Sequence, residues 1–243
     1  MKRFEFYVAP LPEAGFAALG AKPGWKTQTL EVEPGVKLRG LVHAPQNDSA
    51  PWVLFFAGNS PTLLAEAQSF LDTLRGTRDF GVAIYAYRGF DGSTGTPGNL
   101  AIVRDATQIY GQLRAGLPHS KLHLIGFSLG TAIACAVAAQ TTPASVTLLS
   151  PLTEIDIVER SLLARFRKGD RFETLRYLEK LAGPVLVIHG DADQAFPVEM
   201  GRTVSARLGS RARYLELAGV DHLGLLKDPR TLEAVRGLVE PPP

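Results

Sequence analysis

A serine flanked by two glycines forms the motif GFSLG, in which Ser128 lies between Gly126 and Gly130. The motif separates an apolar run at 122–127, typical of a buried strand, from an alanine-rich run at 131–139, typical of a helix. Glycines have no Cβ and so permit a sharp turn from strand to helix. Such a turn would lift the serine hydroxyl above the sheet, beside free N–H groups at the helix N-terminus. The pattern favours a nucleophilic serine over its alternative, an ordinary serine N-cap.

A nucleophilic serine needs an imidazole to take its proton and a carboxylate to hold that imidazole in the correct tautomer. His222 follows the last expected strand, at 214–217, within the run DHLGLL. His222 is the remaining candidate for this imidazole, because three of the other histidines precede the serine and the fourth lies at a strand end before the candidate acid. The histidines excluded in this way are His43, His119, His123 and His189.

Two aspartates compete for the role of the acid in the run HGDADQAFP, which follows an apolar run at 184–188. Asp193 is favoured because it lies a few residues past the strand, where a loop can curl back, whereas Asp191 is better placed for a turn with Gly190. The alternative for Asp193 is likewise a turn aspartate. More remote candidates are Glu154, Asp156 and Asp221. A serine, an acid and a histidine thus each follow a strand, in that order along the chain.

The elements that must position these residues alternate along the chain. The stretch at 25–45 predicts an antiparallel hairpin around a Pro34-Gly35 turn. Five almost continuously apolar runs follow, with helical stretches between them. Strands that are apolar on both faces and separated by helices predict the α/β class, with a mostly parallel sheet and helices on both faces. The runs begin at Trp52, Gly81, Lys121, Ser145 and Pro184, and helices are expected at 62–75, 100–114 and 129–140.

The alternation breaks between Pro151 and Gly183, where a charged stretch is longer than one crossover helix requires. We expect a small helical lid here, inserted into a single domain that spans residues 1–243. Apolar residues at helical spacing would give the lid one apolar face, which either packs on the core or lines an acyl pocket. These residues are Ile155, Ile157, Val158, Leu162, Leu163 and Phe166.

Composition narrows the class of partner. Of the 243 residues, 45% are apolar and 21% charged, which indicates a soluble protein with a sizeable core. The net charge of +2, without a dense Lys/Arg run, argues against nucleic acid and favours a small-molecule or acylated substrate. No run of 18 apolar residues and no signal-like stretch occurs, so we expect no membrane span and a cytoplasmic location. Cys135, the only cysteine, is expected to pack as a small hydrophobe.

A glycine-rich stretch, YRGFDGSTGTPGN, begins at Tyr87. Its spacing matches neither a phosphate-binding loop nor a dinucleotide fingerprint, and no lysine follows it. We interpret it as a turn that packs beside the Ser128 motif. Arg88 is expected to anchor that turn through carbonyl or carboxylate contacts, without a catalytic role.

The motifs GFSLG, YRGFDGSTGTP, HGDADQAFPVE and DHLGLL together resemble the α/β-hydrolase superfamily across roughly residues 26–237. The resemblance is to the branch that contains the mammalian α/β-hydrolase-domain depalmitoylases and their bacterial relatives. It implies the α/β-hydrolase fold and a catalytic triad of Ser128, Asp193 and His222 at the positions that match the motifs.

The same resemblance implies an oxyanion hole made from the backbone N–H groups of Asn59 and Leu129. The chain departs from the pattern at Ala57, where the family usually has histidine. Because main-chain N–H groups form the hole, this change should not abolish it, although it can alter how the loop is held.

The predicted function is therefore a serine hydrolase that cleaves a carboxylic ester or thioester through an acyl-enzyme, with no cofactor and no metal. A peptidase or a perhydrolase would use the same triad. A haloalkane dehalogenase is disfavoured, because that chemistry uses aspartate where this chain has Ser128. A non-catalytic ligand-binding or receptor module on the same fold is the alternative from a different class.

Overall fold

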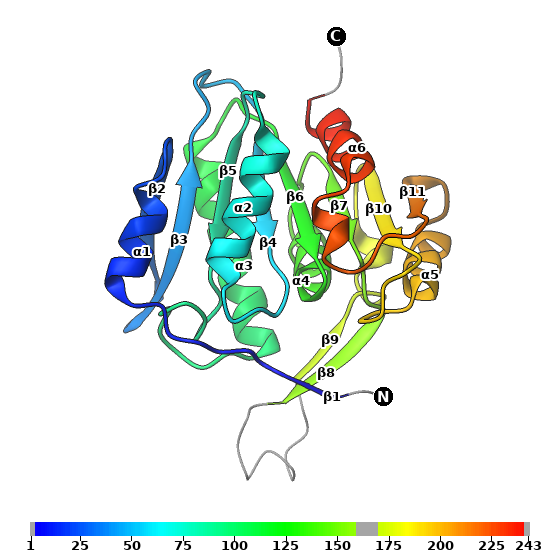
Figure 1. The fold of residues 1–243 in the computed structure, drawn as a ribbon, viewed down its shortest axis with the longest axis horizontal. Helices are drawn as coiled ribbons and strands as arrows, with labels where there is room; N and C mark the ends of the chain where they lie inside the picture. Colours follow the sequence, from blue (N-terminus) through cyan, green and yellow to red (C-terminus); the bar gives the residue numbers. More distant parts are fainter. Residues whose placement is uncertain (1–2, 159–169, 241–243) are drawn as a thin grey trace.

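The computed structural model describes residues 3–158 and 170–240. In these residues the chain forms a central sheet of eight strands and a small sheet of three. Figure 1 shows helices packed on both faces of the central sheet, with the small sheet below its lower edge.

The central sheet has the strand order β11-β10-β7-β6-β4-β5-β3-β2. The six strands from β11 to β5 are parallel to one another, β3 pairs antiparallel with β5, and β2 pairs antiparallel with β3. The middle strands are buried along their whole lengths, as expected for apolar runs covered on both faces. The strands are β2 (Trp25–Glu33), β3 (Val36–His43), β4 (Trp52–Phe56), β5 (Gly81–Tyr85), β6 (Leu122–Phe127), β7 (Val146–Leu149), β10 (Val185–Gly190) and β11 (Ala212–Leu217).

Helices link these strands and cover both faces. α2 packs with α6 on one face, and α3 packs with α4 on the other (Figure 1). The helices are α1 (Glu13–Gly20), α2 (Leu63–Arg75), α3 (Asn99–Gly116), α4 (Leu129–Ala138), α5 (Val198–Leu208) and α6 (Pro229–Val239), with short 3-10 turns at Leu178–Lys180, Gly209–Arg211 and Gly224–Leu226. The predicted α/β class, hairpin, five apolar strands and three helices are confirmed, with bounds shifted by at most a few residues.

The small sheet lies at the edge where the parallel strands end. Its order is β1-β8-β9: β1 (Arg3–Glu5) pairs in parallel with β8 (Glu154–Val158), which pairs antiparallel with β9 (Asp170–Glu173). Figure 1 shows the N-terminal chain, in dark blue, crossing beneath the central sheet to reach β8.

The prediction of a helical lid is wrong for the described part of the 151–183 stretch. Ile155 and Ile157 are buried, whereas Glu154 and Asp156, which alternate with them, are only half-buried. This alternation has the period of a strand, not of a helix, and β8 includes Val158. The other residues of the expected apolar face, Leu162, Leu163 and Phe166, lie outside the described residues.

Candidate active site

Ser128 lies in a strained turn between β6 and α4. Its φ is 54°, in the left-handed region that residues other than glycine rarely adopt. Its side chain makes no capping hydrogen bond to α4, so the N-cap alternative does not describe it. A Cβ on Gly126 would overlap the carbonyl of Gly130, and a Cβ on Gly130 would overlap the carbonyl of Phe56. Both glycines of the motif are therefore needed for close packing of this turn.

Asp193 and His222 meet beyond the ends of β10 and β11. Nδ1 of His222 donates to Oδ2 of Asp193 at 2.7 Å. Oδ1 of Asp193 accepts the backbone N–H groups of Ala195 and Phe196, each at 2.9 Å. Asp191 instead accepts a backbone N–H from the loop after β11 at 2.7 Å. Of the two competing aspartates, the structure brings Asp193 to the histidine.

The remote candidates for the acid make other contacts. Glu154 and Asp156 lie on β8, and Glu154 pairs with Arg171. Asp221 accepts the backbone N–H of Gly224 at 2.6 Å. None of the three is hydrogen-bonded to His222, so the structure gives no support to their role as the acid.

The environment of Asp193 favours its ionised form. Burial alone would raise its pKa, but hydrogen bonds from the His189 and His222 side chains, the Phe196 backbone and the Ser150 hydroxyl lower the pKa of Asp193 far below its usual range. An ionised carboxylate only accepts hydrogen bonds, so Nδ1 of His222 carries the shared proton. Nε2 of His222 is then the nitrogen that can accept one.

Aromatic rings fix the position of the His222 imidazole. Phe127, the neighbour of Ser128, packs on it at a centroid distance of 4.8 Å, and Phe196 packs on it at 5.6 Å. Ser128 and His222 are not hydrogen-bonded to each other in this structure. Catalytic hydrogen bonds are often long before substrate binds, so this geometry is compatible with proton transfer.

The loop after β4 carries Asn59, and the N-terminal segment holds its side chain. Oδ1 of Asn59 accepts the backbone N–H of Tyr7 at 2.9 Å, and Nδ2 donates to the carbonyl of Glu5 at 2.7 Å. The hydroxyl of Tyr87 donates to the carbonyl of Ala57 at 2.8 Å in the same loop. Neither backbone N–H of the pair Asn59 and Leu129 donates to another residue in the described part of the chain.

The glycine-rich turn is anchored as expected. Arg88 makes two hydrogen bonds to Asp105, at 2.6 and 2.8 Å, and pairs with Glu33 at 2.5 Å. Asp91 accepts the backbone N–H of Leu64 at 2.6 Å, near the start of α2. These contacts tie the turn to α2, to α3 and to the hairpin, and none of them joins the Asp193–His222 pair.

Two buried side chains beside Asp193 were not singled out as site residues from the sequence. The hydroxyl of Ser150 donates to Oδ2 of Asp193. Nε2 of His189 lies 3.4 Å from the same oxygen, although His189 was excluded as the base. The available signal was positional: Ser150 directly follows β7, just as Ser128 follows β6.

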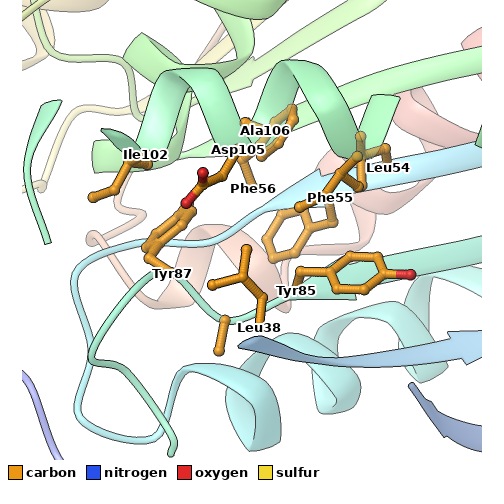
Figure 2. A pocket seen from close by; sticks show the side chains of 11 residues that line it. Leu38, Leu54, Phe55, Phe56, Tyr85, Tyr87, Ile102, Asp105 and Ala106 are labelled. Carbon is orange, nitrogen blue, oxygen red and sulfur yellow. The ribbon is translucent and has the colours of Figure 1, made fainter. Parts of the chain in front are cut away.

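One cavity away from these residues is too small to hold a substrate. Figure 2 shows this cavity between the sheet and α3, lined by residues that include Leu38, Tyr87 and Asp105. Its volume of about 10 Å³ is near the minimum for a single water molecule. In the described ranges, no group of three or more His, Cys, Asp or Glu residues could hold a metal ion. No described helix has the length and hydropathy needed to cross a membrane.

Comparison with known proteins agrees with the fold. The family described as alpha/beta hydrolase fold matches residues 51–181, which include β4 and the turn at Ser128. The chain belongs to this family. This α/β hydrolase superposes on the esterase Pf2001 from Pyrococcus furiosus with a TM-score of 0.67 and 16% identity, over 88% of each chain. It superposes on XC6422 from Xanthomonas campestris, described as an a/b serine hydrolase without lid, with a TM-score of 0.62 and 20% identity, over 90% of this chain and 93% of that one.

Three relatives found by sequence are each less than 30% identical to this chain. The chain is 27% identical to the uncharacterized protein Rv2307c from Mycobacterium tuberculosis, over 92% of this chain and 79% of that one. It is 28% identical to the alpha/beta hydrolase domain-containing protein 17B of Xenopus laevis, over 72% of this chain and 61% of the relative. It is 24% identical to the rat lysophosphatidylserine lipase ABHD12, over 63% of this chain and 44% of the relative.

Proposed function

We propose that this α/β hydrolase cleaves carboxylic esters or thioesters through an acyl-enzyme formed on Ser128. The observation that carries the proposal is the 2.7 Å hydrogen bond between Asp193 and His222, beside a serine held at a φ of 54°. Strain of this kind is retained where the fold over-determines it, which is common at active sites.

The proposed reaction has two steps, acylation of Ser128 and hydrolysis of the acyl-enzyme, and the same catalytic groups act in both. Nε2 of His222 takes the proton from Ser128 as its oxygen attacks the carbonyl carbon, and Asp193 stabilises the imidazolium. The N–H groups of Asn59 and Leu129 bind the oxyanion of the tetrahedral intermediate. The proton then passes to the departing alkoxide or thiolate, and a water molecule repeats the sequence to release the acid.

The N-terminal segment and β8 are proposed to bound the space in which the acyl group lies. Phe4 packs on Phe196 at 5.7 Å, and Phe196 packs on His222. We propose that residues 1–243 form one domain, and that β8, in the 151–183 insertion, lies beside the site. An ester substrate also agrees with the name of one relative, the lysophosphatidylserine lipase ABHD12.

Labelling with a fluorophosphonate tests the proposal, because this probe reacts with an activated serine. The unsubstituted chain should label at Ser128 and hydrolyse p-nitrophenyl esters of graded acyl length. Ser128→Ala should do neither, whereas Ser69→Ala, which removes an exposed serine of α2, should behave as the unsubstituted chain. A Ser128→Ala variant that still labels or hydrolyses would rule out the assignment.

A ligand-binding module is the second candidate, favoured by the lack of a hydrogen bond between Ser128 and His222. Such a module would bind esters without turnover, because the serine would not be activated. It should therefore fail to label with the fluorophosphonate while retaining ester binding measured by calorimetry.

A further inference from the structure

Ser150 lies between the strands that carry the nucleophile and the acid. It follows β7, which has β6 on one side and β10 on the other. Its N–H donates to the carbonyl of Ile188 in β10 at 2.8 Å, and the carbonyl of Leu149 before it accepts the N–H of Ser128 at 3.0 Å. A two-residue step of the chain therefore ties the Ser128 turn to the acid strand.

The backbone of Ser150 is strained and its side chain has no access to solvent. Its φ is 49°, close to the 54° of Ser128, and its exposed fraction is 0%. A non-glycine residue in this conformation costs about 1–3 kcal/mol unless the surroundings impose it. The conformation directs the hydroxyl at the carboxylate of Asp193.

The contacts of the hydroxyl define its role. The Asp193 carboxylate has no proton to donate, so the Ser150 hydroxyl donates to Oδ2. The same oxygen accepts a hydrogen bond from Nδ1 of His222, and Oγ of Ser150 lies 3.0 Å from that nitrogen. Oδ1 is held separately by two backbone N–H groups of the loop. Among the described residues, only Ser150 and His222 donate to Oδ2 at short distance, so without Ser150 the histidine would be left alone there.

His189 also lies beside the Ser150 hydroxyl and the Asp193 carboxylate. Its Nε2 lies 3.1 Å from the carbonyl of Phe196 and 3.4 Å from both Oδ2 of Asp193 and Oγ of Ser150. A neutral imidazole has one N–H, and the carbonyl is its nearest acceptor. His189 therefore makes only a longer contact with the carboxylate, while Ser150 supplies the short hydrogen bond.

We propose that Ser150 is a positioning residue, which orients Oδ2 of Asp193 toward Nδ1 of His222 and so sets the imidazole for proton transfer from Ser128. The inference rests on the proposed function. Ser150 is not a second nucleophile, because its oxygen is buried and lies on the Nδ1 side of His222, away from the nitrogen that accepts the proton.

Two substitutions separate the hydroxyl from the backbone strain. Ser150→Ala removes the hydroxyl and keeps the strain, whereas Ser150→Gly removes both, because glycine adopts a positive φ freely. Loss of a hydrogen bond to a charged group should lower kcat roughly 10- to 100-fold in both variants, with KM unchanged. Ser150→Gly should melt at a higher temperature than Ser150→Ala. Ser150→Cys, which keeps a weak S–H donor, should recover part of the loss.

A double-substitution cycle tests whether the loss passes through Asp193. The rate of fluorophosphonate labelling is measured for Ser150→Ala in the unsubstituted chain and in an Asp193→Ala chain. Slower labelling in the first and no further slowing in the second supports the proposal. The same factor in both backgrounds, or activity that follows the melting temperature, overturns it. If the unsubstituted chain itself fails to label, the proposed function falls and this inference falls with it; normal labelling of Ser150→Ala overturns this inference alone.

Discussion

The two sides of the candidate site are held in different ways. On the acid side, Asp193 accepts hydrogen bonds at both oxygens from the end of β7, from its own loop and from His222. On the oxyanion side, the loop at Asn59 is bridged by the N-terminal segment, more than 50 residues away in sequence. The acid side is thus built into the central sheet, whereas the oxyanion side also depends on a peripheral strand. Substitutions on the two sides should differ in size.

The largest effect should come from the nucleophile that both sides serve. Ser128→Ala should lower kcat for simple esters by about 10³-fold or more, because it removes the attacking oxygen. Alanine favours helix and replaces a serine that makes no side-chain cap, so folding should persist. Steady-state kinetics with circular dichroism as the folding control checks this. Hydrolysis near the unsubstituted rate would contradict the assignment.

On the acid side, Asp193→Asn should cost far more activity than Asp191→Asn. The amide leaves His222 without the carboxylate that fixes its tautomer, so a loss of about 10³-fold or more in kcat is expected. Asp191 contacts a backbone N–H of the loop after β11, so its amide variant is a matched control, expected within a few-fold of the unsubstituted chain. A larger loss at Asp191 would show that the loop register is wrong.

On the oxyanion side, Asn59→Ala should lower kcat/KM by only about 10-fold. The variant keeps the backbone N–H but loses both hydrogen bonds to the N-terminal segment, each worth about 1 kcal/mol. Asn47→Ala, in an exposed loop remote from these contacts, is the control. Deletion of residues 1–6 should reproduce the Asn59→Ala loss. If the deletion leaves kcat/KM unchanged, the N-terminal segment does not support this loop.

The smallest effect concerns acid stability. Because the pKa of Asp193 is lowered in the folded state, its ionisation stabilises the fold above the unfolded value of about 3.9. That contribution is lost as the pH falls below about 3.9 toward the folded value. The melting temperature of Asp193→Asn should therefore fall less steeply below about pH 4 than that of the unsubstituted chain. Parallel curves would mean that Asp193 is not stabilised by its partners.

The acid side of the site could be predicted from the sequence, whereas the support of the oxyanion side could not. Ser128, Asp193 and His222 each follow an apolar strand, so their spacing alone brings them to one edge of a parallel sheet. β1 was not predicted, because three residues carry no periodicity and the strand forms only by pairing with β8. The tether of Asn59 depends on that same pairing.

The error in the insertion has a specific cause. Apolar residues at 155, 157 and 158 fit a helix face if 162, 163 and 166 are added, but they also fit a strand when taken alone. Pairing with β1 and β9 decides between the two, and pairing is not visible in the local pattern. Ser150 was missed for a related reason, since its role depends on a hydroxyl direction set by its backbone.

The pairing of β1 with β8 has a consequence for the timing of maturation. Arg3 pairs with Asp156, so the first strand leaves the ribosome about 150 residues before its partner. At about 5–20 residues per second, it waits some 8–30 seconds without a strand to join. Phe6, which directly follows this strand and ends packed against Phe90 and Phe172, is exposed to water or to a chaperone during that interval. The loop at Asn59 is bridged only after this late pairing, so the appearance of ester hydrolysis during synthesis would report the docking of the first strand.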